Sequence, residues 1–473
     1  MDELINATAC DVVARLKRGD VSPLDCLDAL ESRIAAVNPS VNALVTLCFD
    51  RARDHARAVM AKSEFERGAL AGLPVPIKDL TDVKGVRCTK GSRIFADRIA
   101  PESDLLVRHL EKMDGIVYAM SNTPEFGAGA QTFNDVFGIT RNPWNTSLTP
   151  AGSSGGAAVA LATGMAWVAQ GSDMGGSLRN PASFCGVVGL RPSPGRVAAT
   201  PGMRIDATLG VEGPMARNVA DLALLFDAMS GFEQGDPIAL PRRHHGYSRM
   251  IHSSWRPQRI AFSRDLGITP VDPEVADIVE TAARKLEASR VTVVEAHPDM
   301  AEAMKCFQTL RALDYAIGMR QLLLDHRALL KLEVVWNIEK GLALTGEAII
   351  NAETQRGELF RRMDEFLQVH DALICPATIV APFPVEERFV KSCSGVEFET
   401  YVDWLLIVAV ATLCMCPAIS IPCGFTKSGL PVGMQIITRN RCDAKLIGVA
   451  RHVENVLNLG ALTPIDPKVT HLG

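Results

Sequence analysis

Apolar and polar residues recur at helical spacing over the first 70 residues of the chain. Thr8, followed three residues later by Asp11, suits a helix start, and Gly19 suits the end of that helix. A second helix is expected over residues 22–38, and a third, with scattered charges, near residues 46–65. This part of the chain is therefore predicted to form helices that pack on a core.

The helical spacing of apolar residues is lost between Gly72 and about Met215. Clusters of Gly, Ser and Pro alternate there with short apolar runs, which is typical of strands joined by functional loops. Residues 218–373 return to longer helical patterns, as expected of helices that cover a site. Three further strands and a last helix are predicted from the segments ALICPA, AISIPCGF, PVGMQIIT and DAKLIGVARHVENVL.

These patterns predict an α/β fold in one structural domain, because Pro and Gly mark no clean linker. We divide it into N-terminal helices (1–70), a core (71–217), a helical cap (218–370) and closing strands with a final helix (371–473). The uncharged residues 404–416 are fewer than the about 20 needed to cross a bilayer, so a buried helix is expected there. The acidic start of the chain shows no secretory signal, which favours a cytoplasmic protein without membrane association.

Charge and cysteine content argue against several classes of function. Lys and Arg total 49 against 54 Asp and Glu, and the formal charge of −5 offers no strong attraction to nucleic acid. The 12 cysteines are scattered in a chain too large to need disulfides, so most should be reduced and buried. Cys414, Cys416 and Cys423 lack a CxxC pattern and a nearby His. We expect neither a metal nor an organic cofactor.

Three short segments place a reactive side chain among small residues: VPIKD, AGSSGG and GSDMGGS. In the last of them, Ser177 follows two glycines and precedes a segment that can open as a helix. Backbone N–H groups at a helix start can stabilise the negative oxygen that forms in acyl transfer. Ser177 therefore suits a nucleophile, and a serine that only caps the helix is the simpler alternative.

The other two segments allow more than one interpretation. Lys78 follows an apolar run that should bury its amine and favour the neutral form, which can act as a base. An ion pair with Asp79 or a side chain that reaches solvent are the alternatives. Ser154 fits the G-x-S-x-G pattern of an α/β-hydrolase nucleophile, although no strand pattern precedes it. The base would then be one of three histidines: His370, His452 or His471.

The order and spacing of these segments resemble the amidase signature family. The resemblance is carried by GLPVPIKD, GSSGG and GSDMGGSLRNPASFCGVVGLRP, and outside this run by SNTPEFG, GITRNPW, PAISIP and GLPVGMQII. It implies a single large domain with a central mixed β-sheet covered by helices on both faces. Three residues depart from the family pattern: Ala151, where glycine is usual, and Thr412 and Cys414, which precede PAIS.

The resemblance also implies a Ser, cis-Ser, Lys triad. Ser177 would be the nucleophile, Ser153 the proton shuttle and Lys78 the base. A cis peptide would join Gly152 to Ser153. The backbone N–H groups of four residues would form the oxyanion hole: Met174, Gly175, Gly176 and Ser177. Support would come from Gly152, Ser154, Asp173 and Arg179, with an ordinary surface ion pair as the plainer interpretation of the last two.

We therefore expect a hydrolase that cleaves a C–N amide bond through a serine acyl-enzyme, with esters and carbamates (urethanes) as further substrate classes. Three alternatives stay open: the glutaminase subunit of a tRNA-dependent amidotransferase, an α/β-hydrolase that uses Ser154, and a noncatalytic binding protein. The expected ligand is a small molecule, and a homodimer is allowed. The acyl pocket is expected to draw on residues 123–129, on the cap and on residues 404–416.

Overall fold

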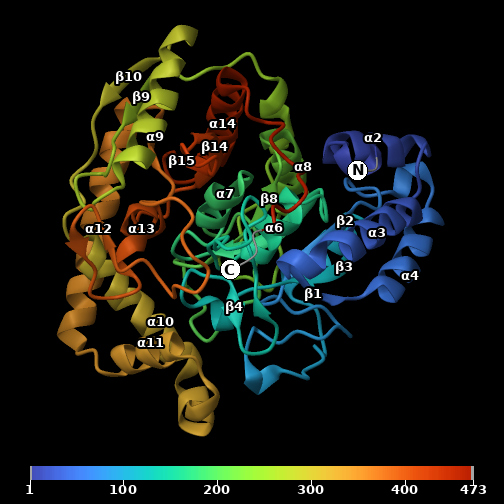
Figure 1. The fold of residues 1–473 in the computed structure, drawn as a ribbon, viewed down its shortest axis with the longest axis horizontal. Coiled ribbons are helices and arrows are strands. Elements are labelled where there is room, and N and C mark those ends of the chain that lie inside the picture. The colour runs from blue at the N-terminus through green and yellow to red at the C-terminus, as the bar shows by residue number, and fades with distance from the viewer. Residues whose placement is uncertain (1–2, 470–473) are drawn as a thin grey trace.

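The centre of the structure, a computed structural model that describes residues 3–469, is an eight-stranded sheet (Figure 1). Its strands follow in the order β10 (Thr292–Glu295), β9 (Arg259–Phe262), β11 (Ala372–Pro376), β15 (Pro431–Ile437), β14 (Ala418–Phe425), β7 (Val188–Arg191), β8 (Val211–Ala216) and β6 (Val168–Asp173). The first three run parallel and the other neighbours antiparallel, so the sheet is mixed. Every residue of β11 and β15 is buried, as their near-continuous apolar sequences require.

A three-stranded sheet lies against the β6 edge. Its order is β1 (Leu44–Leu47), β3 (Ile116–Ser121) and β2 (Pro74–Lys78). The backbone N–H of Lys78 donates a hydrogen bond to the Gln170 side chain of β6, which ties the two sheets together. Two short antiparallel pairs complete the strands: β4 (Phe133–Asn134) with β5 (Gly138–Ile139), and β12 (Ser392–Cys393) with β13 (Val396–Glu397).

Two groups of helices cover the main sheet from opposite faces. One consists of α6 (Gly155–Ala162) and α7 (Arg179–Cys185), and the other of α8 (Val219–Met229), α9 (Pro273–Lys285) and α14 (Asp443–Leu457). Gly433 of β15 lies against Ser183 of α7, and Gly424 of β14 lies against Ile278 of α9. The sheet is thus buried on both faces, and the fold predicted from the family resemblance is confirmed.

The cap consists of three helices, drawn in yellow and orange at the lower left of Figure 1: α10 (Ala303–His326), α11 (Leu332–Leu342) and α12 (Gly346–Val369). Helix α10 packs on the two others and on α13 (Leu406–Leu413). All eight residues of α13 are buried, which confirms the buried helix predicted within residues 404–416. No helix in the described part of the chain is long and apolar enough to cross a membrane.

The N-terminal helices pack at the other end of the molecule: α1 (Glu3–Asn6), α2 (Ala9–Arg18), α3 (Pro23–Val41), α4 (Phe49–Met60) and, beside β3, α5 (Leu105–Lys112). Two predicted helix boundaries are confirmed. The Thr8 side chain accepts a hydrogen bond from the N–H of Asp11, and Gly19 ends α2 with φ +74°. The end expected at residue 38 was wrong, because α3 passes through Pro39 to Val41 and its C-cap residue Asn42 adopts the left-handed conformation.

Two other expectations about secondary structure were wrong. Residues 44–47 form strand β1, so the helix expected near residues 46–65 starts only at Phe49. Residues 218–370 are not all cap, since they also supply α8, α9 and the sheet strands β9 and β10. These strands have four residues each, too few for the sequence to separate a helical from an extended repeat.

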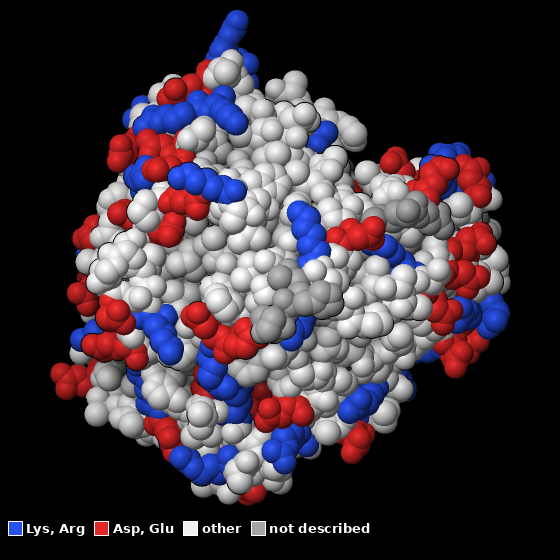
Figure 2. Space-filling model, in the orientation of Figure 1, with Lys and Arg blue, Asp and Glu red and all other residues white. Residues whose placement is uncertain are grey.

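Figure 2 shows acidic and basic side chains intermixed along the two edges of one face, with few charges between them. No large area of a single sign is visible on this face. Acidic and basic side chains are therefore mixed on this face, as their similar numbers in the sequence suggest. The face carries no basic stripe of the kind that binds nucleic acid.

Candidate active site

Strand β2 ends inside the protein on a lysine. The Lys78 side chain is fully buried, and its Nζ lies among three hydroxyl groups. The distance from Nζ is 2.7 Å to Ser153 Oγ, 2.9 Å to Ser154 Oγ and 3.0 Å to Ser172 Oγ. The structure therefore brings together Lys78 and Ser153, two residues that are 75 positions apart in the sequence.

Burial controls the protonation of this lysine. Desolvation lowers the pKa of Lys78 to about 7, against the opposing pull of the Glu212 and Asp173 carboxylates. Asp79 is not its partner, because that carboxylate accepts hydrogen bonds from the N–H and hydroxyl of Thr89, at 2.9 and 2.5 Å. An ion pair with Asp79 and a solvent-exposed amine were both wrong interpretations. A neutral amine is accessible near neutral pH.

The serine loop before α6 has the backbone that the resemblance implied. The peptide between Gly152 and Ser153 is cis. Ala151 has φ +59°, a left-handed conformation that glycine adopts freely and that costs alanine about 1 kcal/mol, which explains why glycine is usual there. The N–H of Ser154 donates to the carbonyl oxygen of Ser177 at 3.1 Å, so the loops that carry the two predicted catalytic serines are joined.

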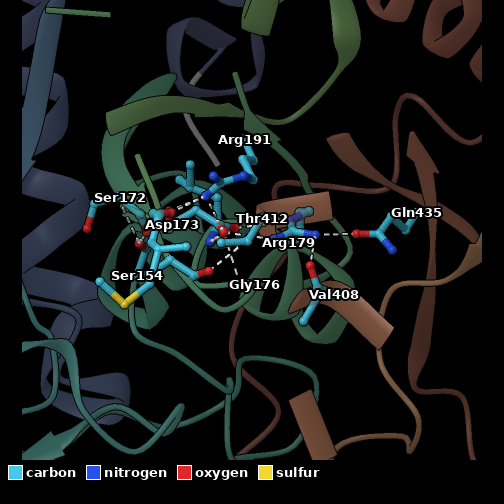
Figure 3. A network of polar contacts seen from close by, with 12 residues as sticks. Ser154, Ser172, Asp173, Gly176, Arg179, Arg191, Val408, Thr412 and Gln435 are labelled. Carbon is cyan, nitrogen blue, oxygen red and sulfur yellow. Dashed lines mark hydrogen bonds and ion pairs between the residues drawn. The ribbon is translucent and has the colours of Figure 1, made fainter. Parts of the chain in front are cut away.

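One buried carboxylate organises the loop that carries Ser177, and Figure 3 shows this carboxylate, Asp173, in a polar network with Gly176, Arg179 and Arg191. Asp173, at the end of β6, accepts from Nε and Nη2 of Arg179 at 3.1 and 2.8 Å. It also accepts from the backbone N–H groups of Gly176 and Leu178, both at 3.1 Å. Neither Asp173 nor Arg179 is exposed, so the interpretation as a surface ion pair was wrong.

Two cations and two strands extend this network. Arg191 Nη1 donates to the carbonyl oxygen of Asp173 at 2.6 Å, and Arg179 Nη1 donates to the Val408 carbonyl at 2.8 Å and to the Gln435 side chain. On the other side, the Thr412 hydroxyl donates to the carbonyl of Met174 at 2.6 Å. Thr412, one of the departures from the family pattern, therefore holds the loop in place.

The four predicted oxyanion donors differ in their surroundings. The N–H of Gly176 already donates to Asp173, whereas Ser177 and Met174 are partly exposed to the cavity. Gly176 has φ +86°, and a Cβ there would lie 2.5 Å from Asn180 Oδ1, so only glycine fits. The Gly176 amide thus supports the loop through Asp173.

A cavity of about 290 Å³ opens above Ser177. Ser153, Ser172 and Ser177 line one part of it. The three regions expected to form the acyl pocket supply a further part of the wall, represented by Phe126, Gly127, Arg311, Tyr315, Met319 and Leu405. Residues outside these regions, among them Leu80, Ala199 and Glu212, complete it. All three regions therefore reach the cavity, which is large enough for a small organic substrate.

The α/β-hydrolase alternative fails on geometry. Ser154 is fully buried beside Lys78 and is not part of the cavity wall. His452 Nε2 lies 2.8 Å from Ser289 Oγ, and His370 Nδ1 lies 2.9 Å from the Phe366 carbonyl, so neither contacts Ser154. His471 lies outside the described residues. Ser154 therefore has no histidine base within residues 3–469.

The structure adds three site residues that sequence reasoning missed: Ser172, Arg191 and Glu212. Each is a polar residue within or at the end of a strand that is otherwise mostly buried, and this position was the only sequence signal that could have identified them.

All twelve cysteines are free and nine are buried. Among residues 3–469 no cluster of His, Cys, Asp and Glu is arranged to hold a metal ion.

Comparisons with known proteins agree with this geometry. The family model described as Amidase matches residues 25–447. An acylamidase from Rhodococcus erythropolis is 33% identical over 477 residues, covering 98% of each chain. A glutamyl-tRNA(Gln) amidotransferase subunit of Moorella thermoacetica is 31% identical over 95% of this chain and 96% of its own. The crystal structure of a bacterial aryl acylamidase of the amidase signature family superposes with a TM-score of 0.90, at 25% identity, over 98% of this chain and 100% of that one.

The matched region includes every residue of the Lys78, Ser153 and Ser177 constellation, and the relatives are matched over nearly their whole length. The protein therefore belongs to the amidase signature family and is a hydrolase that acts on amides.

Proposed function

We propose that this protein hydrolyses its amide substrate through an acyl-enzyme on Ser177, with Ser153 as proton shuttle and Lys78 as base. The observation that carries the proposal is the 2.7 Å contact between the buried Lys78 amine and Ser153 Oγ, beside the cavity onto which Ser177 opens. A base with a lowered pKa, in contact with a hydroxyl that shares a cavity with a second serine, is an arrangement that can activate a serine nucleophile.

Acylation begins when neutral Lys78 accepts a proton from the Ser153 hydroxyl. Ser153 takes the proton of Ser177 as that oxygen attacks the carbonyl carbon of the substrate. The carbonyl oxygen becomes negative and is stabilised by backbone N–H groups of the loop, for which Met174, Gly175 and Ser177 are the best placed. Ser153 then passes a proton to the departing nitrogen, and the C–N bond breaks.

Deacylation repeats these steps with water. The same base and shuttle remove a proton from a water molecule that attacks the acyl carbon, and the acid leaves as Ser177 recovers its proton. The network around Asp173 prepares the loop for both steps, because its charges and hydrogen bonds are already in place before charge develops. Esters and carbamates present the same kind of carbonyl carbon, so we include them in the proposed substrate range.

The second candidate function is the glutaminase activity of a tRNA-dependent amidotransferase, favoured by the similarity to the Moorella thermoacetica protein. Assays of the purified chain alone distinguish the two. We expect hydrolysis of acyl 4-nitroanilides and slower or no release of ammonia from glutamine. Activity confined to glutamine and dependent on an added partner protein would contradict the proposed function.

The proposed base predicts how the rate depends on pH. Protonated Lys78 cannot accept a proton, so kcat/KM should fall as the pH decreases through the pKa of this amine. Burial raises the pKa of Glu212 to about 7, and wherever this carboxyl is ionised its negative charge raises the pKa of Lys78. Glu212→Gln should therefore move the low-pH limb to lower pH, by less than about one unit because Glu212 loses its charge in the same pH range. Full pH profiles of both proteins measure the shift.

An exposed carboxylate provides the matched control for this pH experiment. Glu102 forms a solvent-exposed ion pair with Lys84, and Glu102→Gln should leave the profile unchanged. A limb that moves to higher pH in Glu212→Gln would show that Lys78 is not the group that titrates.

A further inference from the structure

The cap places a buried guanidinium in the wall of the cavity that contains Ser177. Arg311 of α10 is 5% exposed and lines this cavity. Within residues 3–469 it forms no salt bridge. The nearest acidic residue along its helix, Asp314, pairs instead with Arg204, whose Nη1 lies 3.0 Å from the Asp314 carboxylate. Arg311 is therefore a buried cation without a salt-bridge partner in the described part of the chain.

Neutral groups hold this guanidinium in place. Its Nη1 donates to the side-chain oxygen of Asn337, and Nη2 lies 3.4 Å from the Tyr315 hydroxyl. The rings of Tyr315 and Tyr401 face it at 4.6 and 5.3 Å. Amide and aromatic contacts orient a cation and offset part of its desolvation, but they do not neutralise its charge. The five N–H groups of arginine in a planar fork match a carboxylate, which forms two parallel hydrogen bonds with it.

The charges in the cavity wall are unevenly distributed. Glu212 and Asp173 lie on the sheet side, next to the Lys78 region, whereas Arg311 and Asp314 belong to the cap, and Arg204 pairs with Asp314. The Asp173 charge is already balanced by Arg179 and Arg191. Among the described residues, Arg311 is thus the cation of the cavity wall without a salt-bridge partner, and an anionic group on a substrate would be attracted to it.

Helix geometry sets the separation between this cation and the nucleophile loop. The Phe307 ring lies against Gly175, since a Cβ built on that glycine would be 3.2 Å from it. Arg311 follows Phe307 by four residues, so it lies on the same face of α10, about 6 Å further along the axis. A group bound to Arg311 would be a short carbon chain away from a carbonyl at Ser177.

We infer that the site is built for amides that carry a carboxylate, which binds Arg311 while a carbonyl a few carbon atoms away faces Ser177. The inference rests on the proposed function and narrows its substrate class. The carboxylate can belong to the acyl part or to the amine part of the substrate, and both would make the same paired hydrogen bonds.

Two pairs of substrates test the inference. Glutaryl 4-nitroanilide carries a carboxylate on the acyl side, and 5-oxohexanoyl 4-nitroanilide replaces it with a methyl ketone of similar size. N-acetyl-4-aminobutyrate and N-acetyl-5-aminopentan-2-one form the same pair on the amine side. Wild type should prefer the anionic member of at least one pair by about 10-fold or more in kcat/KM. Which pair responds identifies the side that carries the anion.

Substitutions on α10 link this preference to Arg311. Arg311→Gln should lower kcat/KM for the anionic substrate by about 100-fold and leave the neutral one within about 2-fold, and Arg311→Lys should retain part of the preference. Arg320, exposed on the same helix, provides the control, because Arg320→Gln should change neither value.

The outcomes separate the inference from the function on which it rests. The inference would be overturned if Arg311→Gln lowered kcat/KM equally for both members of a pair, because Arg311 would then only hold the cap together. It would also be overturned if wild type showed no preference for the anionic substrate of either pair. Wild type that hydrolyses none of the four substrates, and that a serine-reactive fluorophosphonate does not label, would overturn the proposed function as well.

Discussion

Ser177→Ala is expected to lower kcat for an acyl 4-nitroanilide by at least about 10⁴-fold. The reason is that Ser177 supplies the only nucleophile in the proposed pathway, while Lys78 and Ser153 can act only through it. The backbone donors of the loop remain in this variant, so a small residual rate over water is expected. Release of 4-nitroaniline measures kcat, and the mass of the protein after reaction with a fluorophosphonate reports whether a covalent adduct forms.

Ser154→Ala is the informative comparison for this experiment. Its hydroxyl lies 2.9 Å from Lys78 Nζ but is not part of the cavity wall, so its loss should slow the reaction and still leave Ser177 open to labelling. An adduct that persists in Ser177→Ala and disappears in Ser154→Ala would reverse the assignment of the nucleophile. Unchanged melting temperatures show that both variants are folded.

The residues of the proposed triad could be predicted from the sequence because each lies in a local pattern. Apolar residues before Lys78 indicated burial, and glycines before Ser177 indicated a tight turn at a helix start. Helix boundaries such as Thr8 and Gly19 were predictable for the same reason, since a cap involves residues only a few positions apart.

The contacts that support the site were not predictable, because they join distant parts of the chain. Arg179 reaches Gln435, 256 positions later, and Thr412 reaches Met174 across 238 positions. No local pattern distinguishes Arg311 from any other arginine on a helix. Its importance comes from α10 packing over the cavity and from Asp314 pairing elsewhere, and both facts require the three-dimensional structure.

Asp173→Asn is expected to have the largest effect on stability, lowering the free energy of unfolding by about 3–5 kcal/mol. The amide has nearly the shape of the carboxylate, but it leaves Arg179 and Arg191 fully buried without a counterion. The N–H groups of Gly176 and Leu178 donate to different oxygens of Asp173, and the NH2 group of asparagine cannot accept, so one of these two hydrogen bonds is lost. Thermal and urea unfolding, each followed by circular dichroism, measure the change.

An exposed ion pair gives the matched control for Asp173→Asn. Asp54 lies 2.8 Å from Arg57 with both side chains in solvent, and Asp54→Asn should cost less than about 1 kcal/mol. Replacing Arg179 with methionine in the Asp173→Asn protein should recover part of the loss, because it removes one of the unpaired buried charges. If Asp173→Asn unfolds like the Asp54 variant, the buried charges are balanced in another way, and the nucleophile loop does not depend on this carboxylate.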